Sequence, residues 1–155
     1  MEVDDIEKAI DDLLGHWRKQ KIVSPSNSID ELLNFEFSKC THLPADFRCL
    51  YTMTNGMADL YPNYMDEEGF LFYPLQELST WEEEFNIPSP APSPYEKCLF
   101  FAEYLHKSWW YGVRFSNYTD EYEIGIVSTR FKVIARSLGT FIRLYLKDDP
   151  ILYDY

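Results

Sequence analysis

The sequence predicts an α+β fold, in which N-terminal helices pack on an antiparallel β-sheet meander and a C-terminal helix closes the domain. Two observations support this prediction. Apolar residues recur at helical spacing in the first third of the chain, whereas residues 98–135 form short runs rich in β-branched and aromatic residues. Helices followed by a run of strands are typical of α+β domains. The length of 155 residues suits one domain, so we expect residues 1–155 to form a single unit.

The first predicted helix occupies the start of the chain. Its apolar residues share one face: Val3, Ile6, Ile10, Leu13, Leu14 and Trp17. Acidic residues stand in its first turns, and basic residues close it. Both ends therefore complement the helix dipole.

Two shorter helices follow. Ser28 and Glu31 form a capping box, which predicts a helix whose Leu32 and Leu33 face inward. Pro44 suits the first position of the next helix, because its missing N–H is not needed there. That helix presents Phe47, Leu50, Tyr51 and Thr54 on one face, and Asn55-Gly56 is expected to end it.

The middle of the chain changes character. Phe70 to Tyr73 can form a short strand, and the apolar positions from Leu75 to Phe85 match one more helix. Pro88 to Pro94 then alternate proline with small residues, which excludes a central strand and favours a stiff connection between two halves. A ligand for a proline-reading domain is the alternative interpretation of this segment.

Four strands are predicted after the proline-rich segment: Cys98 to Leu105, Trp109 to Phe115, Tyr122 to Val127 and Phe131 to Ala135. Lys107-Ser108 separates the first two closely enough for a hairpin, and the polar turn Ser116 to Glu121 precedes the third. Ser137 can cap a final helix that Asp149-Pro150 ends.

The charge of the chain is unevenly distributed. The net charge is −12, and the segment from Cys49 to Glu96 supplies −9 of it because it holds no Lys or Arg, so the other 107 residues carry only −3. A block of one sign is a candidate surface for a basic partner, and simple solubility is the competing interpretation. Excess acid disfavours general nucleic-acid binding and attraction to an anionic membrane surface.

The cysteines and the start of the chain suggest a cytoplasmic protein. Cys40, Cys49 and Cys98 are odd in number and form no C-x-x-C pair, so we expect reduced, partly buried thiols. The first residues are acidic where a signal peptide would be basic, and no apolar run approaches the length of a membrane span.

No catalytic or cofactor motif stands out. The sequence has no H-E-x-x-H, G-x-S-x-G, Walker loop or G-x-G-x-x-G, and Cys40 with His42 is too small a set for zinc. Asp66, Glu67 and Glu68 could form an acid/base pair or bind Ca²⁺, but adjacent carboxylates usually mark a solvated loop. We therefore expect no metal, no cofactor and no enzymatic activity, although a site assembled in space would escape a motif search.

The aromatic cluster from Trp109 to Tyr111 is a candidate protein-binding feature. In a strand, Trp109 and Tyr111 share one face and Trp110 takes the other. One face exposes a tryptophan, as protein-binding sites often do, unless the sheet is covered on both sides.

Several segments in order along the chain resemble the SUKH superfamily, which is named in part for fungal cell-wall synthesis regulators. The clearest is a helix signature, Leu43-Pro44-x-Asp46-Phe47-x-x-Leu50-Tyr51, which ends at Asn55-Gly56. The middle helix contributes Trp81, and the strands contribute Phe101-Ala102, Trp110-Tyr111-Gly112-Val113 and Tyr122-Glu123-Ile124-Gly125-Ile126-Val127. The closing helix contributes Ala135-x-Ser137-Leu138-x-x-Phe141-Ile142. The resemblance extends from about Ile29 to Leu146. It implies a non-enzymatic α+β domain without a shared cofactor, and many bacterial members are immunity proteins while others are intracellular adaptors or regulators.

The first hypothesis is therefore a cytoplasmic immunity protein that binds a cognate polymorphic toxin domain, such as a nuclease with a basic surface, and itself exists as a monomer or weak homodimer. Acidic residues would steer the partner and aromatic residues would anchor it. The candidate partner-binding residues are Asp59, Tyr61, Tyr64, Asp66, Glu67, Glu68, Glu82, Glu83, Glu84, Trp109 and Trp110. The alternative is an adaptor or regulatory domain that uses the same surface for a host partner, and an enzyme ranks third.

Overall fold

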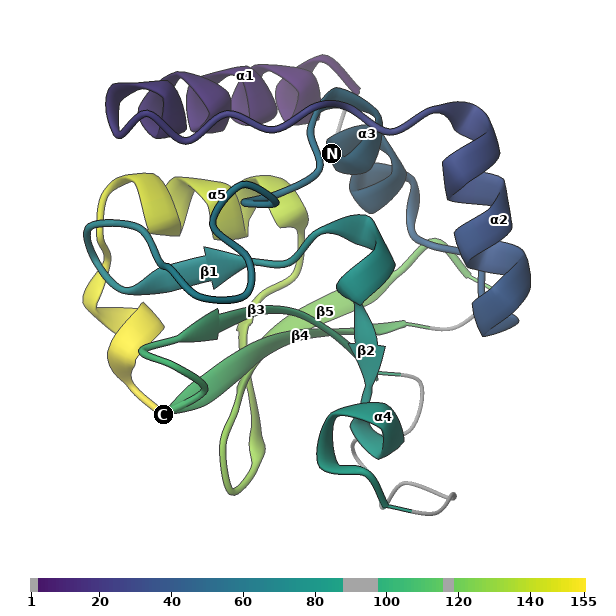
Figure 1. The fold of residues 1–155 in the computed structure, drawn as a ribbon. Coiled ribbons are helices and arrows are strands. Elements are labelled where there is room, and N and C mark those ends of the chain that lie inside the picture. The colour runs from purple at the N-terminus through teal and green to yellow at the C-terminus, as the bar shows by residue number, and fades with distance from the viewer. Residues whose placement is uncertain (1–2, 88–97, 116–118) are drawn as a thin grey trace.

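The computed structural model describes residues 3–87, 98–115 and 119–155. Three helices come first: α1 (Val3–Lys19), α2 (Ile29–Lys39) and α3 (Ala45–Met53), as Figure 1 shows. The predicted proline-rich connection from Pro88 to Pro94 lies outside the described residues, as does the start of the predicted turn at Ser116.

In the described part of the chain, six strands form one sheet in which every pair is antiparallel. The strands are β1 (Phe70–Phe72), β2 (Ser79–Thr80), β3 (Cys98–Tyr104), β4 (Trp109–Phe115), β5 (Tyr122–Val127) and β6 (Phe131–Ala135). β3 to β6 follow one another as a meander, and both β1 and β2 pair with the free edge of β3. The predicted α+β class and its antiparallel sheet are confirmed.

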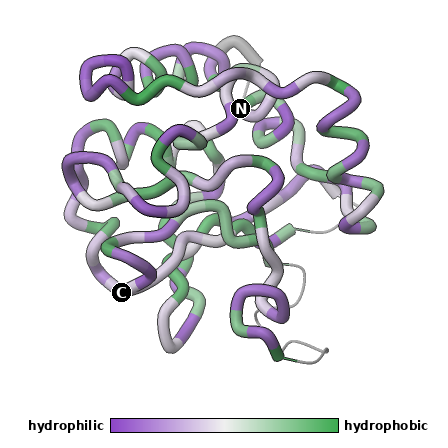
Figure 2. The backbone as a smooth tube through the Cα atoms, in the orientation of Figure 1, coloured by the Kyte–Doolittle hydropathy of each residue, from purple (hydrophilic) through white to green (hydrophobic). Residues whose placement is uncertain are grey.

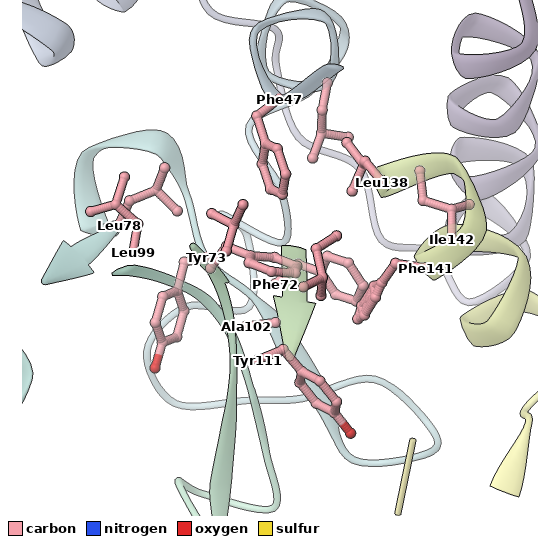
Figure 3. Close-up of a cluster of buried hydrophobic side chains, with 14 of the residues drawn as sticks. Phe47, Phe72, Tyr73, Leu78, Leu99, Ala102, Tyr111, Leu138, Phe141 and Ile142 are labelled. Carbon is pink, nitrogen blue, oxygen red and sulfur yellow. The ribbon is translucent and has the colours of Figure 1, made fainter. Parts of the chain in front are cut away.

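The main core lies between the sheet and the layer formed by α1, α3 and α5 (Leu138–Leu146), with α5 next to the strands (Figure 1). Phe47 of α3 and Phe141 of α5 both contact the ring of Phe101, at centroid distances of 5.2 and 5.3 Å. Figure 3 shows these helices placing their apolar side chains towards Phe72 and Tyr111 of the sheet. The predicted inward faces are confirmed for α3 and, from Ile6 to Trp17, for α1. The predicted inward side chain of Val3 lies outside the description, and Leu14 is half-buried.

The helix predicted from Leu75 to Phe85 is wrong, because the segment divides into η1 (Leu75–Glu77), β2 and α4 (Trp81–Phe85). Ser79 and Thr80 pair with Phe100 and Leu99 of β3, so an extended step interrupts the helical periodicity. Thr80 then forms a capping box with Glu83, and this box starts α4 as a new helix. Pairing with β3 is a non-local contact that periodicity does not reveal.

Element ends also differ from the sequence prediction. Pro44 is the N-cap of α3, one position before the helix, and Thr54 is its C-cap, with Gly56 adopting a left-handed conformation (φ 62°) further on. At the other end of the chain, α5 stops at Leu146, and Pro150 begins the short helix η2 (Pro150–Tyr153). Shifts of one or two residues are usual at helix ends.

The prediction that Leu32 and Leu33 both face inward is correct only for Leu32. Leu32 is 1% exposed, whereas Leu33 is 50% exposed on the outer side of α2. Adjacent helical positions point about 100° apart, so a helix that contacts the core along a narrow face buries only one of them.

Both faces of the sheet are covered at the tryptophans. Trp109 is buried, with its ring stacked between Tyr104 and Tyr155 at 4.7 and 4.4 Å. On the opposite face Trp110 is half-buried, stacks on Phe100 at 5.8 Å and meets Phe85 of α4 edge-on at 5.1 Å. Neither indole is therefore an open aromatic surface.

No helix among the described residues is long and apolar enough to cross a membrane. Hydrophobic positions gather in the strands and on the inner faces of the helices (Figure 2).

Candidate protein-binding surface

The acids of the Cys49–Glu96 segment separate into three structural groups. Asp66 is buried; Glu83 and Glu84 pair with lysines from other parts of the chain; Asp59, Glu67, Glu68 and Glu77 are exposed. Glu82 is half-buried, and Glu96 lies outside the described residues. The block of charge in the sequence is thus not one continuous surface.

Asp66 holds the turn before β1. Its Oδ1 accepts hydrogen bonds from the backbone N–H groups of Glu68, Gly69 and Phe70 at 3.0, 2.9 and 2.8 Å. Its Oδ2 accepts a short hydrogen bond from the Tyr145 hydroxyl, which in turn accepts one from Trp17 Nε1 at 3.1 Å. Burial raises the pKa of Asp66 against the opposing effect of these hydrogen bonds. The residue therefore connects this turn to α5 and α1 and is only 5% exposed.

Glu83 is fixed on the first turn of α4. Its carboxylate accepts a hydrogen bond from the Thr80 backbone N–H at 2.9 Å and lies 2.5 Å from Lys39 Nζ, at the end of α2. Burial alone would raise the pKa of Glu83, but the bonds from Lys39 and Thr80 outweigh burial and hold it below its usual range. This pair joins α4 to α2.

Glu84 lies over the sheet and is linked to one of the predicted tryptophans. Its Oε1 is 3.2 Å from Trp110 Nε1 and 2.7 Å from Lys107 Nζ, and its Oε2 accepts a hydrogen bond from Ser79 Oγ at 3.1 Å. Lys107 stands in the β3–β4 hairpin, where Leu105, His106 and Lys107 all have positive φ. That left-handed run turns the lysine towards α4.

These carboxylates line a cavity of about 270 Å³ between η1, α4 and the β3–β4 hairpin. Two tyrosines, three acids and two lysines contribute to it: Tyr61, Tyr73, Glu77, Glu83, Glu84, Lys39 and Lys107. Tyr61 donates its hydroxyl hydrogen to Glu77 at 3.1 Å, and burial together with Glu77 raises the pKa of Tyr61 to about 12. At neutral pH the cavity therefore offers neutral tyrosines beside a slight excess of carboxylates.

A buried acid lies next to this cavity. Glu103 of β3 is 6% exposed, and its Oε1 accepts a hydrogen bond from the Tyr73 hydroxyl at 2.9 Å. Burial raises the pKa of Glu103, although Tyr73 and Lys107 act in the opposite direction. Glu103 thus fixes the orientation of one tyrosine of the cavity wall.

The remaining candidate residues lie on the long loop between α3 and β1. Tyr64 is 69% exposed, and Asp59 accepts a hydrogen bond from the Val23 backbone N–H at 3.2 Å. Glu67 and Glu68 are exposed beside the end of α1, where the Glu67 backbone N–H donates to Gln20 Oε1 at 2.9 Å. Figure 1 shows this part of the loop near β1, away from α4, so these acids form a second, separate group.

The structure brings together Tyr61, Glu83, Glu84 and Trp110 from the predicted set, and it removes Asp66 and Trp109 from the surface. Sequence reasoning missed Lys39 and Lys107, which come from outside the acidic segment, and also Tyr73 and Glu103. Only Glu103 carries a sequence signal, because it is the single charged residue in the apolar strand Cys98–Tyr104.

A second, larger hollow of about 760 Å³ lies at the N-terminal ends of α3 and α5. Glu123 there bridges two arginines, with both Arg114 Nη2 and Arg136 Nη1 at 2.8 Å from its carboxylate oxygens. None of the predicted site residues lines this hollow. Among residues 3–87, 98–115 and 119–155, no group of three or more His, Cys, Asp or Glu side chains is placed to hold a metal ion.

The comparison with protein families agrees with this architecture. The model of the SMI1 / KNR4 family (SUKH-1) matches residues 27–144, which begin just before α2 and end within α5. No curated protein and no solved structure matches the chain. The matched range contains the whole sheet and the cavity, and leaves α1 outside. The family supports, in general terms, an immunity or regulatory domain that binds partner proteins. Because the match covers most of its length, the chain belongs to the SMI1 / KNR4 family (SUKH-1).

Proposed function

We propose that this chain is an immunity protein, which neutralises a cognate toxin domain in the cytoplasm by binding it and not by catalysing a reaction. The observation that carries the proposal is the arrangement of acids and tyrosines between the α3–β1 loop and α4. Exposed Glu67 and Glu68 stand to one side, and the cavity with Tyr61, Glu77 and Glu83 stands to the other. Two separate acidic groups of this kind would complement a partner domain rich in Lys and Arg, as a nuclease must be to bind phosphate.

The two acidic groups have different roles in this proposal. In the cavity, Glu83 and Glu84 are largely compensated by Lys39 and Lys107, so their long-range field is weak. Glu67 and Glu68 have no ion pair with a lysine or arginine in the described part of the chain, and so contribute more to steering. The exposed ring of Tyr64 and the cavity tyrosine Tyr61 supply the close contacts.

The test is binding to the C-terminal domain encoded by the gene next to that of this chain. We expect a complex whose association rate falls as salt rises. Reversing two charges, Glu67→Lys with Glu68→Lys, should slow association by about tenfold at low salt. The matched control is Asp120→Lys with Glu121→Lys, an adjacent exposed pair elsewhere on the surface, which should change the rate less than twofold.

Three results would count against the proposal. Absence of binding would refute the immunity role and favour the regulatory alternative within the same family. Equal slowing by both double variants would show that only net charge matters. An association rate that does not depend on salt would remove electrostatic steering from the model.

A further inference from the structure

The connection between α1 and α2, residues 20–28, lies against the α3–β1 loop, and Figure 1 shows it running back past α1 towards α2. At the start of the loop, Ser24 Oγ donates a hydrogen bond to the carbonyl oxygen of Gly56 at 2.7 Å and accepts one from the Asn55 N–H at 3.1 Å. Ser24 is therefore a double link between the connection and the residues that follow α3.

Two further contacts follow in reverse order along the two segments. The Val23 N–H donates to Asp59 Oδ2 at 3.2 Å, and the Glu67 N–H donates to Gln20 Oε1 at 2.9 Å near the end of the loop. Positions 24, 23 and 20 thus meet positions 55–56, 59 and 67, so the two segments run antiparallel. We call residues 20–24 the brace, because they contact the loop at its start, in its middle and near its end.

The Gln20 side chain has a partner at both ends of its amide. A backbone N–H can only donate, so the Glu67 N–H must meet the amide oxygen, and this leaves Gln20 Nε2 3.1 Å from His16 Nε2 of α1. His16 in turn packs edge-on against the ring of Tyr145 of α5, at a centroid distance of 5.5 Å. The contact with the loop is therefore built on two helices that pack together.

The loop carries the exposed residues that the proposed function assigns to the partner. Tyr64, Glu67 and Glu68 are all exposed. The bond from the Glu67 N–H to Gln20 also lies at the surface, where water would replace a lost partner, so it contributes little to overall stability and mainly restricts the loop. A loop that is ordered before binding loses less conformational entropy in the complex.

The brace lies before the range that the family model matches, residues 27–144. The contacts that order the loop at Gln20, Val23 and Ser24 therefore come from a part of the chain that the family model does not cover.

We propose that Gln20 and Ser24 are positioning residues for partner recognition, which hold the α3–β1 loop in the conformation that presents Tyr64, Glu67 and Glu68 to a basic protein partner. The inference rests on the proposed function and names the residues that prepare its surface. They act through the loop and do not themselves need to touch the partner.

The first test needs no partner and follows single backbone amides of the full chain by NMR hydrogen exchange. Gln20→Met keeps a side chain of similar length without the amide oxygen, so exchange at the Glu67 N–H should become faster by about fivefold or more. The N–H groups of Gly69 and Phe70 donate to Asp66 Oδ1 and should change by less than about twofold.

Ser24→Ala is the second variant. It removes the acceptor of the Asn55 N–H, whose exchange should also become faster. Ser26→Ala is the matched control, because it makes the same change two positions away at an exposed residue, and it should leave exchange at Asn55 and Glu67 unaltered. Melting curves check that all three variants fold.

The second test measures binding to the neighbour-encoded C-terminal domain. Both brace variants keep every charge of the chain, so the association rate should stay within about twofold, whereas Gln20→Met should raise the dissociation rate by about three- to tenfold. A merely structural role would lower the folded fraction and leave the dissociation rate of the folded molecules unchanged.

Four results would overturn the proposal: unchanged exchange at Glu67 in Gln20→Met, equal acceleration of exchange along the whole chain, the same effects in Ser26→Ala, or an unchanged dissociation rate in Gln20→Met. Failure of the unaltered chain to bind the C-terminal domain would refute the immunity role. The exchange measurement is made without a partner, so it still decides whether the brace orders the loop.

Discussion

Asp66 has two competing roles that one substitution distinguishes. The sequence suggested that it binds a partner, whereas the structure indicates that it stabilises the turn before β1. Asp66→Ala removes the acceptor for three backbone N–H groups and for the Tyr145 hydroxyl. Loss of a capping side chain costs about 1 kcal/mol. Leaving buried donors without partners adds about 2 kcal/mol. These two costs sum to about 3 kcal/mol, which is an upper value because the burial cost behind the raised pKa of Asp66 is relieved by the substitution.

Urea unfolding followed by tryptophan fluorescence measures this change in the free energy of unfolding. For a chain of 155 residues, a loss of about 3 kcal/mol corresponds to a fall in Tm of about 6–12 °C. Asp66→Asn keeps one oxygen for the turn and should lose about half as much. Glu67→Ala, the exposed neighbour, should stay within about 0.5 kcal/mol. A loss below about 1 kcal/mol for Asp66→Ala would refute the argument that this carboxylate holds the turn against α5.

Three further predictions concern acid stability, backbone geometry and thiol reactivity. Because the pKa of Glu83 is lowered, its ionised form stabilises the protein at pH values above the ordinary pKa of 4.5, and this stability is lost as pH falls through the folded-state pKa. Glu83→Gln keeps the cap but cannot ionise, so it should make Tm fall less steeply at acid pH. An unchanged acid limb of the Tm-against-pH curve would contradict this. Gly56→Ala should destabilise by more than about 2 kcal/mol in urea unfolding, because φ is 62° and the new Cβ would stand 2.5 Å from a backbone carbonyl oxygen, while Gly15→Ala in the interior of α1 should stabilise slightly. Exposed Cys40 should react promptly with a thiol reagent. Cys98 is buried, and burial raises its pKa to about 12, so it should react only when the protein unfolds. Prompt labelling of Cys98 in the folded protein would contradict this prediction.

Local sequence rules predicted most of the elements. The capping box at Ser28, the cap at Ser137 and the strand from Tyr122 to Val127 depend on residues close together in the chain, and each stands where the sequence places it. The same rules failed from Leu75 to Phe85, where pairing of Ser79 and Thr80 with β3 breaks one apparent helix into three short elements. Short segments yield to such tertiary contacts because their intrinsic preferences are small.

The candidate surface was predictable only in its composition. The sequence located the acids, but the electrostatic field of a charge depends on its neighbours in space. The structure places Lys39 and Lys107 against Glu83 and Glu84, and it buries Asp66. A basic residue more than twenty positions away in the chain is invisible to a count of charge along a segment.

What the sequence determined by itself was the fold class and its resemblance to the SUKH superfamily, because caps, turns and hydrophobic periodicity are local properties. Only the tertiary structure decided which side of α2 meets the core, and so which of Leu32 and Leu33 is covered. It also decided which tryptophans and acids remain on the surface. The physical reason is that burial and ion pairing are set by contacts between segments distant in the chain, whose relative placement no single segment encodes.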